Sequence, residues 1–491
     1  MLIKQSQDEI QSYLEDASNF RSGSAEALYV PENEAEIVQA VTECGRQKIP
    51  LTITGGGTGT VAGRIPASGR ILTVEKLDRI LSVEPERNRA SLQAGVVIDN
   101  FLKFLEKDNL FYPPFPTERT AFISGNASTN ASGEYSYYFG PTRRYVERLK
   151  IVFSDGEVVE VRRGETFAGR DGFLKIGSKK VKIPSYVTPD IKCSAGYFCR
   201  PGMDAIDLFI GSEGTLGIFT EVEVSLIPAL SNRVIMLFFF SEKERLFEFL
   251  SAVKSDKALF ALTLEYFDSH SLDFLRPDFP NIPECKFALY IEVLESSLEK
   301  WLNLLEGYPI IDTWVGQDAK SYQTLIDFRH RLPENINAYF KKIGCTKVSL
   351  DFAVPADRFA ELYAYYQNVR EANSDVETIL FGHIGENHLH FNYFPKDQKE
   401  KERVICLYEE AARKVISMGG TIAAEHGIGK LKHKYLEMMY GREGILEMAA
   451  VKKVLDPACI LGLDNIFPRS LFKKGGINHA KSTVSETKAG Y

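Results

Sequence analysis

The sequence lacks the features that mark disulfide scaffolds, membrane-spanning proteins and general nucleic-acid binders. Its seven cysteines are odd in number and include no C-x-x-C pair, which argues against a disulfide framework and against an iron–sulfur cluster held by this chain. The densest apolar run near the middle covers residues 234–240, whereas a helix needs roughly 20 residues to cross a bilayer. The 59 basic and 66 acidic residues leave a net charge of −7, so we expect no broad basic face for nucleic acid.

The remaining composition is typical of a globular protein with more than one domain. The chain has 491 residues, of which 44% are hydrophobic and 25% are charged, and a length of this size favours two or three domains. Residues 1–16 carry early acidic side chains and lack the apolar core of a secretory signal. We therefore expect a cytoplasmic protein, free or peripherally bound to a membrane, whose oligomeric state stays open.

The apolar spacing predicts a mixture of helices and strands. Asn33, with Glu36 three residues later, is a helix-start signal for residues 33–45. Asp155-Gly156 predicts a two-residue hairpin turn between the strands 149–153 and 157–161. Beyond residue 230 strands and helices alternate, which predicts a second, layered α/β domain. The strands expected there are 234–240, 287–293 and 347–354, and the helices are 242–254, 296–305, 356–371 and 397–418.

Three segments rich in small residues are candidates for a cofactor site. The strand 51–54 leads into the loop Thr54–Thr60, whose four glycines let the backbone approach a diphosphate. This loop matches neither a Walker A motif nor G-x-G-x-x-G, so a flexible turn is the alternative. The segment 116–133 gathers Ser, Thr, Asn, Gly and Ala side chains, which suit a cofactor wall or a polar loop. A third segment, G-S-E-G-T-L-G at 211–217, again permits a close backbone approach.

Histidines gather in the C-terminal part of the chain. His388, His390 and Asn392 alternate along an expected strand and so share one face, and a glycine-containing bend can bring His383 back towards that face. Further on, the segment 421–429 supplies adjacent Glu and His side chains. Two imidazoles and one carboxylate with an open position form a common catalytic zinc set, which Mn²⁺ or Fe²⁺ would also accept. The alternative is a group of satisfied polar core residues.

Taken in order, these segments resemble FAD-dependent enzymes of the vanillyl-alcohol-oxidase type, from about residue 25 to 470. The resemblance implies an α+β fold with an FAD-binding domain at 1–229, an α/β cap at 230–462 and a C-terminal segment, 463–491, that returns to the FAD domain and ends in a loose tail. The loop 54–60 has no His or Cys, so non-covalent FAD is expected. The implied cofactor-binding residues are Gly55, Gly56, Gly57, Thr58, Gly59, Ser124, Gly125, Asn126, Thr129, Gly214 and Ile218; the family usually has Gly where Ser124 stands.

The histidine segment resembles the branch of this family that acts on D-2-hydroxy acids, which includes D-lactate dehydrogenases and the glycolate oxidase large subunit. That branch has G-H-x-G-D-G-N-x-H and a later A-E-H-G. The resemblance implies that His383, His390 and Glu425 bind a divalent metal, and Zn²⁺ is the metal expected. It implies that His426 is the catalytic base and that Asn392 contacts the substrate. The pattern is broken at Glu386, Asn387 and His388. His388 is therefore an extra imidazole, which either tunes the substrate pocket or joins the metal.

The same resemblance assigns a carboxylate clamp to Arg329 with Lys347 as its helper, because a guanidinium binds a carboxylate in two-pronged fashion. It implies oxidation of a small 2-hydroxy acid to the 2-keto acid, with hydride passing to flavin N5 and the proton to His426. D-lactate, glycolate and D-2-hydroxyglutarate all remain possible substrates. The electron acceptor is equally open between a quinone, a cytochrome, an electron-transfer flavoprotein and a partner subunit. The alternatives are a peroxide-producing oxidase, another enzyme class on this scaffold, and a non-catalytic flavin subunit. Residues 164–206 receive no role, although Lys192–Tyr197 faintly resembles a family segment.

Overall fold

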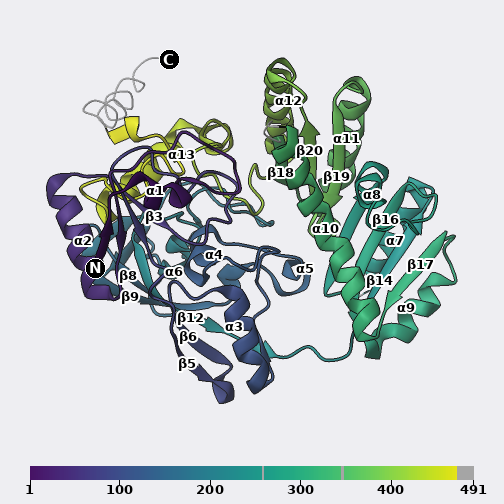
Figure 1. Ribbon diagram of the computed structural model, residues 1–491, viewed down its shortest axis with the longest axis horizontal. Helices are drawn as coiled ribbons and strands as arrows, with labels where there is room; N and C mark the ends of the chain where they lie inside the picture. Colours follow the sequence, from purple (N-terminus) through teal and green to yellow (C-terminus); the bar gives the residue numbers. More distant parts are fainter. Residues whose placement is uncertain (257–258, 344–347, 473–491) are drawn as a thin grey trace, which may run out of the picture.

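The computed structural model describes residues 1–256, 259–343 and 348–472, so the predicted helper Lys347 lies outside the described residues. The chain forms two layered bodies that lie side by side, an N-terminal domain and a cap (Figure 1). Within the described ranges, no helix combines the length and apolar character that a bilayer span requires. The six cysteines in these ranges form no disulfide.

The N-terminal domain begins with a four-stranded sheet in the order β1-β2-β4-β3. Its strands are β1 (Leu2–Lys4), β2 (Ala27–Val30), β3 (Leu51–Thr54) and β4 (Arg70–Thr73). The expected helix is confirmed as α2 (Glu34–Gln47), and Asn33 caps it by accepting a hydrogen bond from the Glu36 N–H at 3.0 Å. The glycine-rich loop follows the end of β3, so the sheet fixes where the loop begins.

A second, five-stranded sheet in the order β5-β6-β12-β8-β9 completes the N-terminal domain. Its strands are β5 (Ile80–Glu84), β6 (Arg89–Gln93), β8 (Val146–Val152), β9 (Val158–Arg162) and β12 (Ile218–Ser225). The predicted hairpin is confirmed, since β8 and β9 pair antiparallel. Its turn is longer than the expected two residues: the N–H of Phe153 donates to the carbonyl of Glu157, so residues 154–156 form the loop, and Gly156 takes the positive φ, +86°. Smaller elements surround this sheet: α3 (Ile98–Leu105), β7 (Leu110–Phe111), α4 (Ile123–Thr129), α5 (Ser136–Phe139), β10 (Phe173–Ile176), β11 (Lys179–Lys182), α6 (Ala205–Phe209) and β13 (Ile227–Pro228).

The cap is built on a seven-stranded sheet in the order β17-β14-β16-β15-β19-β20-β18, and every strand pair described in it is antiparallel. Its strands are β14 (Arg233–Phe240), β15 (Thr263–Asp268), β16 (Phe287–Leu294), β17 (Asp312–Gly316), β18 (Val348–Ala353), β19 (Glu377–Gly382) and β20 (His388–Phe394). Its helices are α7 (Lys243–Ser255), α8 (Ser269–Leu275), α9 (Leu298–Leu305), α10 (Ala319–Ile343), α11 (Phe359–Ala372) and α12 (Gln398–Ser417). The expected helices and strands of this half are thus confirmed to within a few residues.

The chain contacts the N-terminal domain again after the seven-stranded sheet of the cap. Helix α13 (His433–Leu455) lies over the N-terminal body (Figure 1). The buried Lys452 ammonium pairs with Asp456 at 2.7 Å and donates to the carbonyl of Thr215 at 2.8 Å. The backbone N–H groups of Ile428 and Gly429 already donate to the Glu213 carboxylate. The polar contacts to the N-terminal domain therefore begin near residue 428, inside the segment expected to form the cap, and the boundary at 462 stays a prediction.

Candidate active site

A single cavity of about 650 Å³ extends from the glycine-rich loop to the histidine segment of the cap. All three small-residue segments of the N-terminal domain contribute to its wall. Of the residues predicted to bind the cofactor, those that line it are Gly55, Gly56, Gly57, Thr58, Gly59, Ser124, Gly125, Asn126, Thr129 and Gly214. From the cap it is lined by Arg329, His383, His390, Asn392, Glu425 and His426. The predicted cofactor wall and the predicted catalytic groups therefore face one common space.

The glycine-rich loop is shaped so that side chains are excluded from its backbone. Gly57 has φ of +80°, which disfavours other residues, and the guanidinium of Arg64 lies against it. A Cβ at Gly56 would lie 2.6 Å from the carbonyl oxygen of Thr120. Arg64 donates to the Gly55 carbonyl at 3.3 Å and also lines the cavity, so it brings a fixed positive charge beside the loop. A bare backbone next to a cation suits a diphosphate.

The second wall comes from α4 and the loop that follows it. A Cβ at Gly125 would meet nothing within 4 Å, since this backbone borders open space in the cavity. The amide nitrogen of Asn126 and the hydroxyl of Ser132 are buried without a hydrogen-bond partner among the described residues. Buried polar groups are normally paired, so these atoms fit a ligand that supplies acceptors and donors. The lining of the cavity thus fits FAD: the glycine-rich loop suits a diphosphate, and α4 and the loop after it offer polar groups without partners.

One predicted cofactor contact is placed differently. Ile218 is fully buried and packs in the core between the strands, and it is not among the residues that line the cavity. Its neighbours Gly217 and Phe219 line the cavity instead. Successive residues of a strand point to opposite faces, so the side chain of Ile218 faces away. Its backbone contact to the cofactor stays a prediction.

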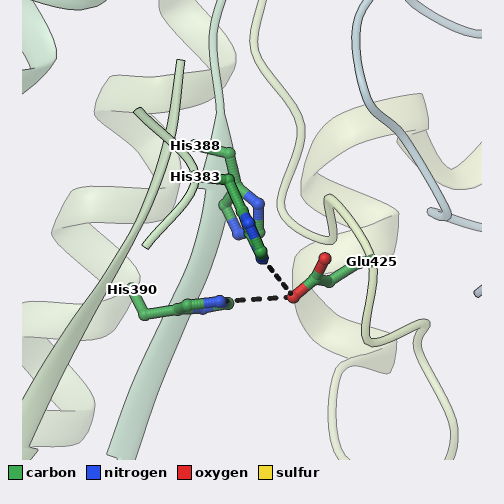
Figure 2. A group of neighbouring side chains, drawn as sticks. All are labelled: His383, His388, His390 and Glu425. Carbon is green, nitrogen blue, oxygen red and sulfur yellow. Dashed lines mark ion pairs between the residues drawn. The ribbon is translucent and has the colours of Figure 1, made fainter. Parts of the chain in front are cut away.

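At the cap end of the cavity, two imidazoles converge on one carboxylate oxygen (Figure 2). Nε2 of His383 lies 3.4 Å and Nε2 of His390 lies 3.2 Å from Oε1 of Glu425. Ligand atoms around a tetrahedral zinc, at bond lengths of about 2.0–2.1 Å, are separated by about 3.3 Å. The three predicted ligands therefore come together at distances that fit a divalent metal. His383 reaches the group because the turn after β19 folds it back towards β20, as the glycine-containing bend suggested.

The far nitrogen of His383 is held by a carboxylate that the sequence did not reveal. Nδ1 of His383 lies 2.7 Å from Oε1 of Glu265 on β15. Burial opposes the charged imidazole, but the Glu265 carboxylate outweighs it and raises the pKa of His383 to about 9. A carboxylate on the outer nitrogen fixes the ring and increases its strength as a metal ligand. No motif marked Glu265, since only the antiparallel pairing of β15 with β19 brings it here.

Lys192 is a second residue that the sequence placed without a role. Its ammonium is almost fully buried and lies 2.8 Å from Oε2 of Glu425 and 2.8 Å from Oε2 of Glu386. Burial alone would lower the pKa of Lys192, but the carboxylates of Glu386 and then Glu425 outweigh the effect of burial and raise this pKa. Despite burial, Lys192 and then His383 hold the pKa of Glu425 well below its usual range. The faint family match at Lys192–Tyr197 was the available signal.

His426 is held beside the cluster by Asp351 of β18. The carboxylate of Asp351 accepts the backbone N–H of His426 at 2.9 Å and lies 3.5 Å from its Nδ1. It also pairs with Lys432 at 3.1 Å. Burial lowers the pKa of His426 to about 4, although Asp351 opposes this shift. The imidazole is therefore neutral near pH 7 and free to accept a proton.

Arg329 projects from α10 into the cavity and is 6% exposed. Its guanidinium donates to the Thr117 hydroxyl at 3.3 Å and lies 3.5 Å from each of the carboxylates of Glu134 and Glu265. Its Nε is buried and has no hydrogen-bond partner among the described residues. On the sheet, Asn392 pairs with Ser349, and both line the cavity. A donor-rich guanidinium and an amide thus face the cluster.

The fold and the site together define an FAD-binding oxidoreductase. A loop that suits a diphosphate, a polar cofactor wall and a set of acid–base side chains line one cavity. Two family models match the chain. The FAD binding domain matches residues 25–162, and the C-terminal domain of FAD linked oxidases matches residues 229–463.

Curated relatives match nearly the whole chain. Glycolate oxidase subunit GlcD of Bacillus subtilis (strain 168) is 28% identical over 94% of this chain and 93% of its own length. D-lactate dehydrogenase of Anaerostipes hadrus is 28% identical over 89% of this chain and 88% of its own. D-2-hydroxyglutarate dehydrogenase of Stutzerimonas stutzeri (strain A1501) is 26% identical over 94% and 95%.

Solved structures share the fold at low sequence identity. An alkyldihydroxyacetonephosphate synthase superposes with a TM-score of 0.69 at 14% identity, covering 95% of this chain and 83% of that chain. The 4-ethylphenol oxidase of Gulosibacter chungangensis gives a TM-score of 0.69 at 14% identity, covering 96% and 95%. The chain belongs to the FAD-linked oxidoreductases of the vanillyl-alcohol-oxidase type, in the branch of the D-2-hydroxy-acid enzymes. The expected family and fold class are confirmed.

Proposed function

We propose that this protein oxidises a small D-2-hydroxy acid to the corresponding 2-keto acid. The observation that carries the proposal is the shared cavity: the guanidinium of Arg329, the amide of Asn392 and the imidazole of His426 face the same space as the cofactor wall. A 2-hydroxy acid needs an anchor for its carboxylate, a base for its hydroxyl proton and an acceptor for its C–H electrons. The names of the relatives support the same substrate class.

Arg329 would bind the substrate carboxylate. Its contacts to Glu134 and Glu265 are long, at 3.5 Å each, and the Nε that faces Glu134 makes no hydrogen bond among the described residues, so a substrate carboxylate would offer the guanidinium shorter contacts. A guanidinium forms short, two-pronged hydrogen bonds with a carboxylate, which also orient the carbon next to it. Asn392, across the cavity on β20, would donate to the hydroxyl or carboxylate oxygen.

His426 would take the hydroxyl proton at Nε2, while Nδ1 faces Asp351 at 3.5 Å. The buried carboxylate would stabilise the imidazolium that forms and fix the ring plane, as a paired acid does for a general base. Stacking on His390, with ring centroids 5.2 Å apart and planes 11° apart, restricts the ring further. When bound, FAD supplies the electron-accepting ring and a divalent metal on His383, His390 and Glu425 supplies a Lewis acid for the hydroxyl oxygen.

Anaerobic stopped-flow spectroscopy tests the proposal. The purified protein is mixed with D- and L-forms of lactate and 2-hydroxyglutarate, and with glycolate, and bleaching of flavin absorbance is followed. We expect at least one D-2-hydroxy acid or glycolate to reduce the flavin, with L-acids slower. A flavoprotein that no member of the panel reduces would refute the assignment.

Variants assign the roles. We expect His426→Ala to keep its flavin and to reduce it about 10²–10⁴ times more slowly, the usual contribution of a general base. Arg329→Met should chiefly raise the substrate concentration needed for half-maximal reduction. His270→Ala is the matched control, because His270 lies on α8, bonds the Thr378 carbonyl and does not line the cavity.

A further inference from the structure

A third imidazole stands in the histidine cluster. His388 begins β20, two residues before His390, so both rings lie on one face of the strand (Figure 2). Their ring centroids are 4.6 Å apart, and the His383 centroid lies 5.3 Å from that of His388. One ligand atom from each of His383, His388, His390 and Glu425 falls within 4.8 Å of all the others. Four donors from one strand, one turn and one loop therefore converge.

His388 does not serve the substrate pocket. It is fully buried, and it is absent from the residues that line the cavity, whereas His383, His390 and Glu425 all line it. A side chain that sits behind the cavity wall cannot contact a substrate in the cavity directly. Of the two roles that the sequence left open for this residue, the structure therefore disfavours the tuning of the pocket.

The ring of His388 has one close polar neighbour, the carboxylate of Asp351. Neither of its nitrogens has a partner with acceptable geometry among the described residues, although Nε2 lies 3.1 Å from Oδ1 of Asp351. Asp351 has other partners, since it accepts the backbone N–H of His426 at 2.9 Å and pairs with Lys432 at 3.1 Å. Asp351 thus keeps these two partners if His388 turns towards a metal. A buried imidazole that has neither a well-formed hydrogen bond nor a metal is costly in free energy.

The charge around the cluster also favours a bound cation. Five carboxylates belong to the cluster, contact its imidazoles or pair with a cation beside it: Glu425 belongs to it, Glu265 and Asp351 contact its imidazoles, Glu386 pairs with Lys192, and Glu134 pairs with Arg329. Within the described part of the chain, three Lys and Arg side chains form ion pairs with these carboxylates: Lys192, Arg329 and Lys432. Metal binding requires neutral imidazoles. In that state two negative charges are left over among these groups, which one divalent ion would balance. Buried charges of one sign are otherwise strongly unfavourable.

We propose that His388 is a fourth protein ligand, so that this chain holds its metal with three imidazoles and one carboxylate. The proposal rests on the metal-assisted function above and deepens it. A tetrahedral ion with four protein ligands has no open position, so the substrate oxygen must then be added as a fifth ligand. His388 thereby serves to keep the ion in place rather than to contact the substrate.

X-ray absorption at the zinc edge of the Zn²⁺-loaded protein counts the imidazoles directly, without any substitution. We expect three imidazoles in the wild type and two in His388→Asn. We also expect a chelator to remove Zn²⁺ from His388→Asn at least about tenfold faster than from the wild type, since ligand-shell changes typically alter affinity by about 10–100-fold. His270→Asn, a histidine outside the cluster, should match the wild type in both measurements.

Two imidazoles in both proteins, with equal rates of zinc loss, would overturn the proposal and leave His388 as a partner of Asp351. A wild-type protein that takes up no Zn²⁺ would overturn it as well. Flavin reduction in the same preparation separates these failures from failure of the proposed function: reduction by a 2-hydroxy acid without zinc would keep the activity and remove the metal from it. If His388→Asn is poorly folded, the imidazole count of the wild type alone decides.

Discussion

Replacing Lys192 by methionine tests whether the buried charges hold the two domains together at the site. Lys192 belongs to the N-terminal domain, whereas its partners Glu386 and Glu425 belong to the cap and the loop after it. The lysine side chain is 3% exposed and the two glutamates are 13% and 12% exposed. Methionine keeps the apolar stem and removes only the charge, so two nearly buried carboxylates lose their cation.

Removing one partner of a buried ion pair costs about 3–5 kcal/mol, because the remaining charge stays desolvated. Both glutamates keep a little solvent contact, so we expect the lower end, a loss of about 3 kcal/mol in the free energy of unfolding. A bound divalent ion would neutralise Glu425 in place of the lysine. Saturating Zn²⁺ should therefore stabilise Lys192→Met more than the wild type, and Lys192→Met/Glu386→Gln should recover part of the loss.

Urea unfolding followed by tryptophan fluorescence measures this, because both tryptophans of the chain, Trp301 and Trp314, lie in the cap. Lys254→Met is the matched control. The Lys254 ammonium donates to the Ile384 carbonyl and to the Asn387 amide oxygen, in the turn that also carries Glu386, and its hydrogen bonds there go to no carboxylate. A Lys192→Met protein as stable as Lys254→Met, with no extra response to Zn²⁺, would refute the reasoning.

Three further outcomes are expected. Because the pKa of His383 is about 9, a metal must displace the imidazolium proton below pH 9, and the apparent Zn²⁺ affinity should fall about tenfold per pH unit towards pH 7. Competition with a chromophoric chelator measures this affinity, and an affinity that does not change with pH would contradict the prediction. Asp351→Asn should slow flavin reduction by about 10²-fold or more with FAD still bound, as measured by stopped flow. Reduction at the wild-type rate would show that this carboxylate does not assist His426. Gly57→Ala should lose FAD on gel filtration, because its φ is +80° and Arg64 fills the space, whereas Gly307→Ala should not.

Local patterns in the sequence predicted the elements well, because each depends on neighbours in the chain. The capping signal at Asn33 and the Asp-Gly hairpin signal describe contacts over a few residues. The cap and the hairpin are both found, although the hairpin loop has three residues instead of two. The alternation along β20 also sufficed to place His388, His390 and Asn392 on one face. The family motifs added the expectation that these residues share one site with a distant glycine-rich loop.

The supporting groups of the site were beyond reach for a physical reason. Glu265, Lys192 and Asp351 act through contacts between segments 75 to 233 residues apart in the chain. A lone charged residue in a strand or loop has no local signature, and its value depends on which distant side chain it meets. The polar contacts near residue 428 between the later chain and the N-terminal domain were equally out of reach, since they leave no composition shift.

The loop that carries Glu425 and His426 is fixed from both domains, which explains why the motif G-S-E-G lies so close to the chemistry. On the cap side, Asp351 accepts the backbone N–H groups of both residues. On the other side, the two carboxylate oxygens of Glu213 accept the N–H groups of Ile428 and Gly429 at 2.7 and 2.6 Å. Glu213 and Gly214 also line the cavity. The motif that lines the cavity therefore also holds the loop of the proposed base and of one proposed metal ligand, so one set of hydrogen bonds connects the cofactor wall with the proposed catalytic groups.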